Sequence, residues 1–267
     1  MGTETKTLYQ FPISHFCEKA RWSLDAKGVS YRIKNLMPGL HVLMLRRVSG
    51  TRSVPVLVDG ATTVTDSTAI ALYLDRAYPG ARLVPEGEPE RARTLDLDTY
   101  FNRMAGETVR RWLYGELMNE GPGNAVAAMF GGYPAPVRGL GKLLAPMIEK
   151  ELRRMYRINA ESVAQSRRGL LEAAQRLEDE TGGDPGRYLV GSSLSLADIT
   201  AASTLSVIVS PPGSPYASEP GSSARAVAET RQALRERPAG RWVMERYRRD
   251  RTRSASHPRG SRDATSP

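Results

Sequence analysis

Residues 54–64, which read VPVLVDGATTV, constrain the fold of this chain more than any other segment. Residues 54–58 predict a strand, Asp59 and Gly60 are a strong hairpin signal, and residues 61–64 predict an antiparallel return strand. Because a proline donates no hydrogen bond to a strand ladder, Pro55 is expected at a strand start or at a sheet edge. The segment therefore predicts a β-hairpin.

The residues before this hairpin predict a β-α-β unit. Residues 6–11 (KTLYQF) are short, apolar and compatible with a strand, and residues 31–34 (YRIK) predict a second one. Between them the pattern changes to helical spacing at Ser14. Gly28 supplies a stop, because glycine accepts the left-handed conformation that ends many helices. A further short helix is expected over residues 40–48.

After the hairpin, a helix is expected to begin at Asp66 or Ser67, either of which can cap it. Its apolar residues recur at the spacing of one helix face. The order β-α-β-α-β-β-α is therefore complete by residue 78, and residues 1–80 are predicted to form an α/β domain.

The remainder of the chain contains no convincing strand pattern and is predicted to be helical. Prolines interspersed with charges mark a linker over residues 81–89, and an all-helical domain is expected over residues 90–250. Ser195 and Asp198 resemble the reciprocal cap that starts many helices. The glycine- and proline-rich residues 121–146 predict an irregular or mobile excursion, whose role as a cover over a pocket is left open. The longest helical patterns cover residues 90–119 and 147–181.

The net charge of +9 is concentrated at the carboxyl-terminal end of the chain. Residues 231–267 contain 11 arginines and four acidic residues, which leaves residues 1–230 close to neutral at +2. A surface that binds nucleic acid needs clustered Lys and Arg on folded structure, whereas residues 251–267 have the composition of a disordered basic tail. No specific nucleic-acid partner is therefore expected, and a weak contact with an anionic partner is the alternative.

Two further features bear on the compartment. No stretch approaches the ~20 consecutive apolar residues of a membrane span, and no basic flank followed by an apolar run marks a secretory signal. Cys17 is the only cysteine, which excludes an internal disulfide framework. These features predict a cytoplasmic protein.

Four motifs, taken in order, resemble the glutathione S-transferase family. They are LYQFPISHFCEKARWSLDAKGVSY at 8–31, SVPVLVDG at 53–60, TDSTAIALYLD at 65–75 and LSLADITAASTL at 194–205. The first three resemble the family's amino-terminal domain and the fourth its helical domain. The resemblance implies a thioredoxin-like α/β domain followed by an all-α domain, a homodimer, and glutathione or another low-molecular-weight thiol as co-substrate.

The resemblance assigns the sulfur of that thiol to the start of the first helix. Aligned through Lys19, Ser14 falls where many of these transferases keep the residue that contacts the thiol, and Cys17 falls on a second, usually non-nucleophilic, position. His15 replaces the usual proline. A thiol with a pKa of about 8.5 is mostly protonated at pH 7. Lowering this pKa by two units needs about 2.7 kcal/mol of stabilisation of the thiolate. A helix amino terminus and a hydrogen bond from Ser14 can supply this stabilisation. Ser14 also suits a plain helix cap, and Cys17 suits packing on an apolar helix face.

The rest of the bound tripeptide is assigned in the same way. The resemblance implies a cis bond between Val54 and Pro55, which would free the backbone of Val54 to pair with the tripeptide; a trans proline at a strand edge is the alternative. Asp66 and Ser67 match the pair that receives the γ-glutamyl group, although helix capping needs the same residue types. His41 could reach the glycyl carboxylate, or it could be a solvated loop residue.

The second substrate, a small-molecule electrophile, is expected between the two domains. Tyr100, Met104 and Arg111, with Trp112 as the alternative, lie roughly on one face of the helix predicted over residues 90–119. Such a stripe is also typical of a helical core. One cysteine and three scattered histidines do not make a metal site, so no metal is expected.

Three functions are compatible with the resemblance. The first is a glutathione S-transferase-type enzyme that promotes attack of a small thiol on an electrophile, with detoxification as its role. The second is a thiol-dependent reductase, dehalogenase or isomerase that uses Cys17. The third is a non-catalytic thiol-binding regulatory protein. Because the family spans several reactions, the motifs do not identify the electrophile.

Overall fold

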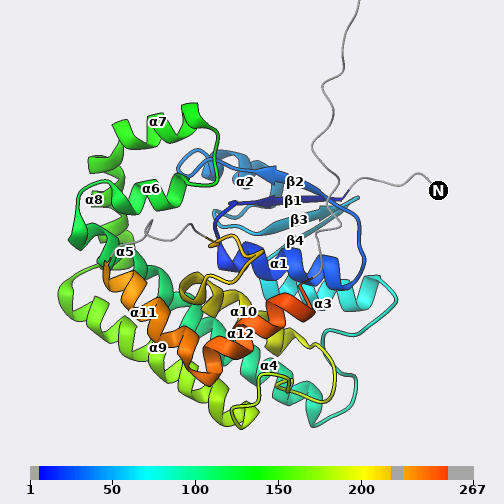
Figure 1. Cartoon of the computed structure of the whole chain (residues 1–267). Helices are drawn as coiled ribbons and strands as arrows, with labels where there is room; N and C mark the ends of the chain where they lie inside the picture. Colours follow the sequence, from blue (N-terminus) through cyan, green and yellow to red (C-terminus); the bar gives the residue numbers. More distant parts are fainter. Residues whose placement is uncertain (1–5, 218–224, 252–267) are drawn as a thin grey trace, which may run out of the picture.

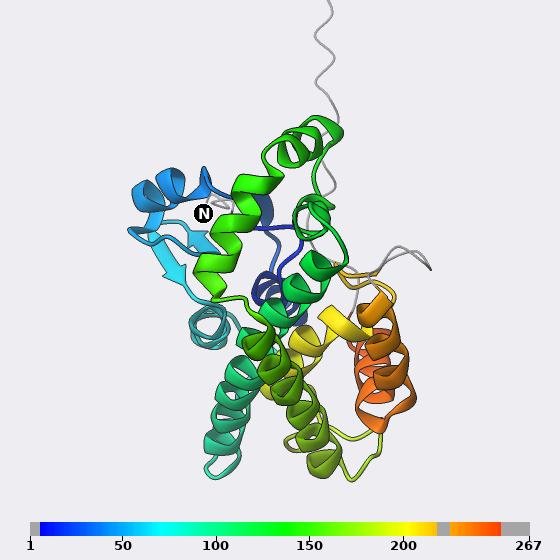
Figure 2. The ribbon, with the colours of Figure 1, turned by 90° about the vertical axis from the view of Figure 1, so that its left-hand side faces the viewer.

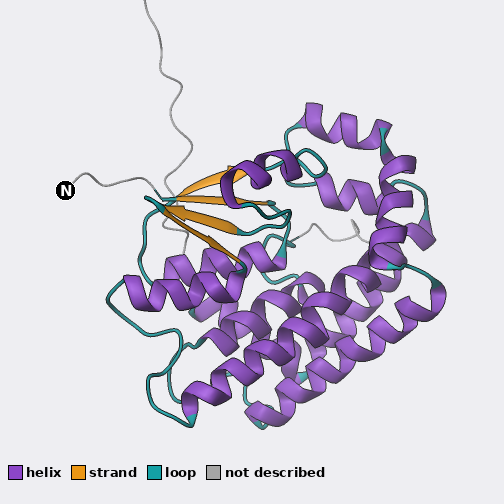
Figure 3. Ribbon diagram, turned by 180° about the vertical axis from the view of Figure 1, so that it is seen from behind, coloured by secondary structure: helices purple, strands orange, loops and turns teal. Residues whose placement is uncertain are grey.

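One sheet organises the first part of the computed structural model, which describes residues 6–217 and 225–251. Its strands are β1 (Thr7–Gln10), β2 (Arg32–Asn35), β3 (Val56–Asp59) and β4 (Thr62–Thr65). They lie in the order β2-β1-β3-β4. β1 is parallel to β2 and antiparallel to β3, and β3 pairs antiparallel with β4 (Figure 3). These pairings confirm the predicted β-α-β unit and the hairpin.

Three helices pack on this sheet: α1 (His15–Ala26), α2 (His41–Ser49) and α3 (Ser67–Ala77). α1 and α3 cover the face that points toward the rest of the molecule, and α2 lies on the other side (Figure 1). Leu8 and Leu57 face each other across β1 and β3, are fully buried, and pack with Leu24, Ile70 and Leu74 of the helices. This arrangement confirms the thioredoxin-like domain.

The described chain is helical from Glu90 onward. Its helices are α4 (Glu90–Phe101), the π-helix η1 (Asn102–Glu107), α5 (Thr108–Glu120), α6 (Asn124–Phe130), α7 (Ala135–Leu143), α8 (Ala145–Tyr156), α9 (Ala160–Thr181), α10 (Leu196–Val209), α11 (Arg225–Glu236) and α12 (Pro238–Arg249). Every residue of α10 is buried, as expected for a largely apolar helix whose small polar side chains bond mainly within the helix. The reciprocal cap of Ser195 and Asp198 is present at its start. No helix within the described ranges is long and apolar enough to cross a membrane.

The single helix predicted over residues 90–119 is divided into α4, η1 and α5. η1 winds with the wider π spacing over Asn102–Glu107. A π segment rotates the side chains that follow it relative to a continuous α-helix. The faces that sequence spacing assigns beyond residue 101 are therefore wrong.

The irregular excursion expected over residues 121–146 is also wrong, because most of these residues are helical. Their glycines allow close packing: a Cβ at Gly132 would lie 2.7 Å from Pro12 Cβ. Pro136 and Pro146 lie in the first turns of α7 and α8, where a missing N–H costs nothing. The glycines and prolines therefore shape short helices in this segment.

The predicted basic tail begins inside the fold. Arg251 Nε lies 2.7 Å from Glu18 Oε1, and its Nη1 lies 2.7 Å from Asp25 Oδ2. Both carboxylates are on α1 and are buried, and Arg21 Nε contacts Glu18 as well at 2.8 Å. The ion pairs therefore attach the end of the helical domain to the first domain. Residues 252–267, the rest of the predicted tail, lie outside the described residues.

An Arg251→Ala variant is expected to lose about 3 kcal/mol of unfolding free energy, because two buried carboxylates lose a compensating charge. Urea unfolding measures this difference. The matched control is Arg248→Ala, which removes a largely exposed ion pair with Glu245 and should leave the unfolding free energy close to that of the wild type. Equal losses in the two variants would contradict a structural role for the Arg251 contacts.

Candidate functional site

The predicted thiol-binding residues come from four segments that meet at one end of the sheet. The ends of β1, β2 and β4 and the start of β3 lie there, since Tyr9 pairs with Val56 and Val56 pairs with Thr65. Each predicted residue lies within six residues of one of these strand ends. They are Ser14, His41, Val54, Pro55, Asp66 and Ser67.

Ser14 is the residue that caps α1. Its backbone is extended, with φ −157° and ψ 123°, and its Oγ accepts a hydrogen bond from the N–H of Cys17 at 3.3 Å. Because Oγ acts only as an acceptor in this bond, the hydroxyl hydrogen is available to a ligand. The side chain is partly exposed, and the N–H groups of the first turn add positive potential beside it. An anion at this point would therefore be stabilised from two sources.

Cys17 lies in the core, one turn into the same helix. It is fully buried, and burial raises the pKa of its thiol more than the nearby Arg21 charge and the Ser14 hydroxyl lower it. A buried, protonated thiol is a poor nucleophile. The structure therefore favours the packing interpretation of Cys17 over the covalent one.

The bond between Val54 and Pro55 is cis, as the resemblance implied. Within the described part of the chain, the N–H and C=O of Val54 make no backbone hydrogen bond. Its side chain packs in one apolar cluster with Phe11 of the β1–α1 loop. Val54 therefore offers an unpaired main-chain edge beside the start of α1.

Asp66 caps α3 in an unusual backbone conformation, with φ 77° and ψ 139°. Its Oδ1 accepts hydrogen bonds from the N–H groups of Thr68 at 2.8 Å and Ala69 at 3.0 Å. A positive φ at a residue other than glycine costs about 1–3 kcal/mol and is found most often at functional sites. Ser67 is buried, and its hydroxyl makes no hydrogen bond to any described residue.

His41 is held at the start of α2. Its Nδ1 accepts a hydrogen bond from the N–H of Gly39 at 3.1 Å, and its ring meets the ring of Phe11 edge-on at 4.9 Å. Burial lowers its pKa, which favours the neutral ring. With Nδ1 as the acceptor, the proton of the neutral ring lies on Nε2. His41 is therefore an ordered donor, although nothing in the sequence fixed its position.

A buried polar cluster, which the motifs did not reveal, ties this site to the helical domain. Lys19 Nζ of α1 lies 2.5 Å from Asp98 Oδ1 of α4 and 2.7 Å from Thr68 Oγ1 of α3. Thr68 and Thr200 also donate to the Asp98 carboxylate, at 2.8 and 2.5 Å. Burial lowers the pKa of Lys19, and the Asp98 carboxylate opposes this shift. Since Thr68 follows Ser67, this cluster fixes the start of α3. The only signal in the sequence is a lysine on a buried face of α1.

The structure does not bear out the residues suggested for the second substrate. They pack against α9 and the helical core: Tyr100, Met104, Arg111 and Trp112. Arg111 donates through Nε to the backbone carbonyl of Tyr156 at 2.8 Å. The Arg176 guanidinium of α9 lies 5.4 Å from the ring of Tyr100. The π segment η1 accounts for part of the error, because it shifts the residues that follow it relative to a continuous α-helix, whereas Tyr100 lies before it.

Other residues of the helical domain face the start of α1. A Cβ at Gly106 of η1 would lie 3.0 Å from the ring of Phe16, so the two segments are in contact. The guanidinium of Arg110, one turn later, lies 5.3 Å from the centre of the same ring. From the α6–α7 connection, Tyr133 donates its hydroxyl hydrogen to the carbonyl of Leu36 at 2.5 Å. Figure 2 shows α6, α7 and α8 rising from the helical domain beside the sheet domain.

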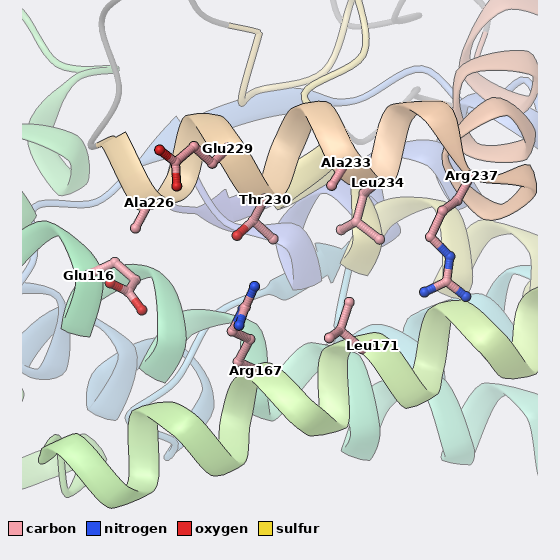
Figure 4. A pocket seen from close by; sticks show the side chains of 9 residues that line it. All are labelled: Glu116, Arg167, Leu171, Ala226, Glu229, Thr230, Ala233, Leu234 and Arg237. Atoms are coloured by element: carbon pink, nitrogen blue, oxygen red, sulfur yellow. The ribbon is translucent and has the colours of Figure 1, made fainter.

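A separate groove of about 470 Å³ lies between α9 and α11, away from the end of the sheet (Figure 4). Its lining residues are Glu116, Arg167, Leu171, Ala226, Glu229, Thr230, Ala233, Leu234 and Arg237. None of the residues predicted from the motifs is among them. Within residues 6–217 and 225–251, no group of three or more His, Cys, Asp or Glu side chains could hold a metal ion.

Sequence comparisons agree with the geometry of the first domain. Residues 8–82 match the family model described as the glutathione S-transferase amino-terminal domain. A glutathione S-transferase of Triticum aestivum is 36% identical over 86 residues, which are 32% of this chain and 40% of that protein. Glutathione S-transferase Z1 of Arabidopsis thaliana is 34% identical over 94 residues, 34% of this chain and 42% of that protein. The chain thus spans about two fifths of the length of these relatives.

Comparisons of structure extend over both domains. A glutathione transferase of Phanerochaete chrysosporium superposes with a TM-score of 0.61 at 20% identity, covering 92% of this chain and 97% of that one. A beta-etherase of Sphingobium superposes with a TM-score of 0.58 at 21% identity, covering 91% and 100%. At these identities the likeness establishes the fold alone. Residues 8–82 are therefore similar to the amino-terminal domain of glutathione S-transferases, and the described chain has the two-domain fold of the solved transferases on which it superposes.

Proposed function

We propose that this protein is a glutathione S-transferase-type enzyme that binds glutathione or a similar small thiol at the end of the sheet and activates its sulfur for attack on an electrophile. One observation carries the proposal. The cap of α1 at Ser14, the unpaired backbone of Val54 before a cis proline, and the strained cap at Asp66 all lie at the same edge. Together they provide an anion site, a main-chain edge and a site for a charged amino-acid end.

Ser14 acts in this proposal as a hydrogen-bond donor to the sulfur. Its hydroxyl and the first-turn N–H groups favour the thiolate over the thiol, and the released proton passes to solvent. A shift of about two pKa units needs about 2.7 kcal/mol, which a charge-assisted hydrogen bond and a helix amino terminus can supply together. The thiolate then forms a bond to carbon, and the electrophile either releases a leaving group or is protonated.

The remainder of the thiol compound would extend along the same edge. Val54 would pair its main chain with the backbone of the tripeptide. The hydroxyl and the backbone N–H of Ser67 would hold the γ-glutamyl carboxylate, and Asp66 would attract the ammonium group of the same residue. His41, through Nε2–H, would contact the glycyl carboxylate. The buried cluster of Lys19 keeps the start of α3 in place.

Two alternatives predict different behaviour. The relatives include a probable maleylacetoacetate isomerase of Vibrio cholerae, 40% identical over 60 residues that are 22% of this chain and 28% of that protein, and isomerisation could use the same thiolate. A reductase or dehalogenase that depends on Cys17 is disfavoured by the burial of that thiol. A thiol-binding regulatory protein would bind the thiol without turnover.

Replacing Ser14 by alanine is expected to raise the pKa of the bound thiol toward its value in solution, because one donor to the thiolate is lost. At pH 7 we expect kcat/KM with glutathione and 1-chloro-2,4-dinitrobenzene to fall at least tenfold, and the pH profile to move to higher pH. The matched control is Cys17→Ser, which should keep at least a third of the activity. Loss of activity in Cys17→Ser with an active Ser14→Ala would support the covalent alternative instead.

The role of Ser67 is separable from that of Ser14. A Ser67→Ala variant is expected to weaken glutathione binding about tenfold in a calorimetric titration, since it removes one hydrogen bond to a carboxylate. The pKa of the bound thiol should stay within about 0.3 units of the original, because the sulfur lies elsewhere. An unchanged Kd would show that Ser67 only starts α3.

Assembly and location follow as further parts of the proposal. Two copies are expected to form a homodimer, as the family resemblance implies, and sedimentation equilibrium should give twice the chain mass of 29.3 kDa. A mass of one chain would refute it. Action in the cytoplasm and a role in detoxification stay predictions.

A further inference from the structure

Arg110 is a cation that the fold leaves without an anion, beside the proposed sulfur site. It lies on α5, one turn after Gly106, whose backbone contacts the ring of Phe16. Phe16 is in the first turn of α1, two residues after Ser14. The side of α1 that faces the helical domain therefore presents a positive charge close to the point where the sulfur would lie.

Two aromatic rings hold the guanidinium in position. Its centre lies 5.3 Å from the ring of Phe16 and 5.2 Å from the ring of Tyr156. Contacts of this kind are favourable and restrict the orientation of the group. They do not neutralise its charge or use its hydrogen-bond donors, so the donors remain available to a ligand.

No described residue accepts a hydrogen bond from Arg110 or pairs with it, and its Nε is buried without a partner. This sets it apart from Arg111, Arg21 and Arg251, each of which has an oxygen acceptor. Glu107, three residues earlier, is exposed and forms no ion pair with it. A partly buried charge without a partner is costly, which makes an external anion favourable.

The neighbouring titratable group, His15, neither adds to the charge of Arg110 nor cancels it. His15 is buried with no hydrogen-bond partner for either ring nitrogen among the described residues. Burial, and next the charge of Arg110, lower its pKa far below the ordinary value. The imidazole is therefore neutral, and a ligand at this point would interact with the positive charge of Arg110.

We propose that the second substrate carries a carboxylate, and that Arg110 binds it through two parallel hydrogen bonds. This inference rests on the proposed function and names the substrate class for the same site. The forked donors of arginine match a carboxylate in plane and spacing. The carboxylate takes no part in the bond between sulfur and carbon, so Arg110 selects the substrate and orients it.

Glutathione also has carboxylates, which are a second source of the same chemistry. The start of α3 and His41 are the groups that fit those two carboxylates, and both lie along the edge of the sheet. Arg110 belongs to the helical domain and contacts α1 from there. The electrophile is therefore the source that the geometry favours, and the experiment separates the two.

The test compares two electrophiles that differ in one charge, 4-chloro-3-nitrobenzoate and its methyl ester, in wild type and in Arg110→Met. In wild type we expect kcat/KM to favour the acid after correction for the two uncatalysed rates. In Arg110→Met that ratio should fall at least tenfold, while kcat/KM for the ester changes less than threefold. The Kd of glutathione, from calorimetry, should stay within twofold.

Two further variants make the result specific. Arg154→Met removes an exposed charge from α8, two residues before Tyr156, and should leave the ratio unchanged. Arg110→Lys keeps the charge without the fork and should recover only part of the preference. If Arg110→Met does not fold, as circular dichroism would show, Arg110→Lys and Arg110→Gln carry the comparison.

The other outcomes also decide for or against the inference. An unchanged acid-to-ester ratio shows that Arg110 does not select the substrate. A weaker Kd for glutathione with an unchanged ratio assigns Arg110 to the tripeptide. If the wild type turns over neither compound, the binding of 3-nitrobenzoate in the presence of glutathione is measured by calorimetry. Binding that is lost in Arg110→Met would support the anion site although the proposed activity fails. No binding to the wild type would contradict both the anion site and the proposed activity.

Discussion

The burial of charged groups on α1 is the constraint on which both halves of the molecule depend. Ten of the 12 residues of this helix are buried, and they include Glu18, Lys19, Arg21 and Asp25. A buried charge without a partner costs several kcal/mol, so each must be matched from outside the helix or along it. α4 supplies Asp98, and the chain just beyond α12 supplies Arg251. α1 can be buried in this way only when the helical domain is packed on it.

This dependence explains the geometry of the site. The sheet determines where α1 begins, since only residues 11–13 separate the end of β1 from Ser14. The helical domain determines how α1 is rotated, through the contacts of Lys19 and Arg251. The proposed thiol and the proposed electrophile both meet at the first turn of α1, the thiol from the edge of the sheet and the electrophile from the helical domain. Both are therefore positioned by a single rigid helix, and their separation does not depend on a flexible loop.

Local chemistry explains why several features could be predicted from the sequence: the strands, the order of helices and strands in the first domain, and the cap of α10. The turn at Asp59 and Gly60 fixes a hairpin whatever packs around it. The partner of Lys19 could not be predicted, because Asp98 is 79 residues away. The sequence could not show which of Arg110 and Arg111 faces the start of α1 either, since this depends on a π segment that residue spacing does not reveal. Gly132 lies in the turn between α6 and α7, but its close contact with Pro12 of the β1–α1 loop could not be predicted.

Two anions in one site would oppose each other, and Arg110 addresses this problem. Two unit charges about 8 Å apart at an effective dielectric constant of ~20 repel by about 2 kcal/mol. That is close to the whole stabilisation that the helix terminus and Ser14 supply to a thiolate. Binding an acidic electrophile without a countercharge would therefore return the sulfur to its protonated form. A guanidinium beside Phe16 gives the carboxylate its own partner, so the thiolate persists when both substrates are bound.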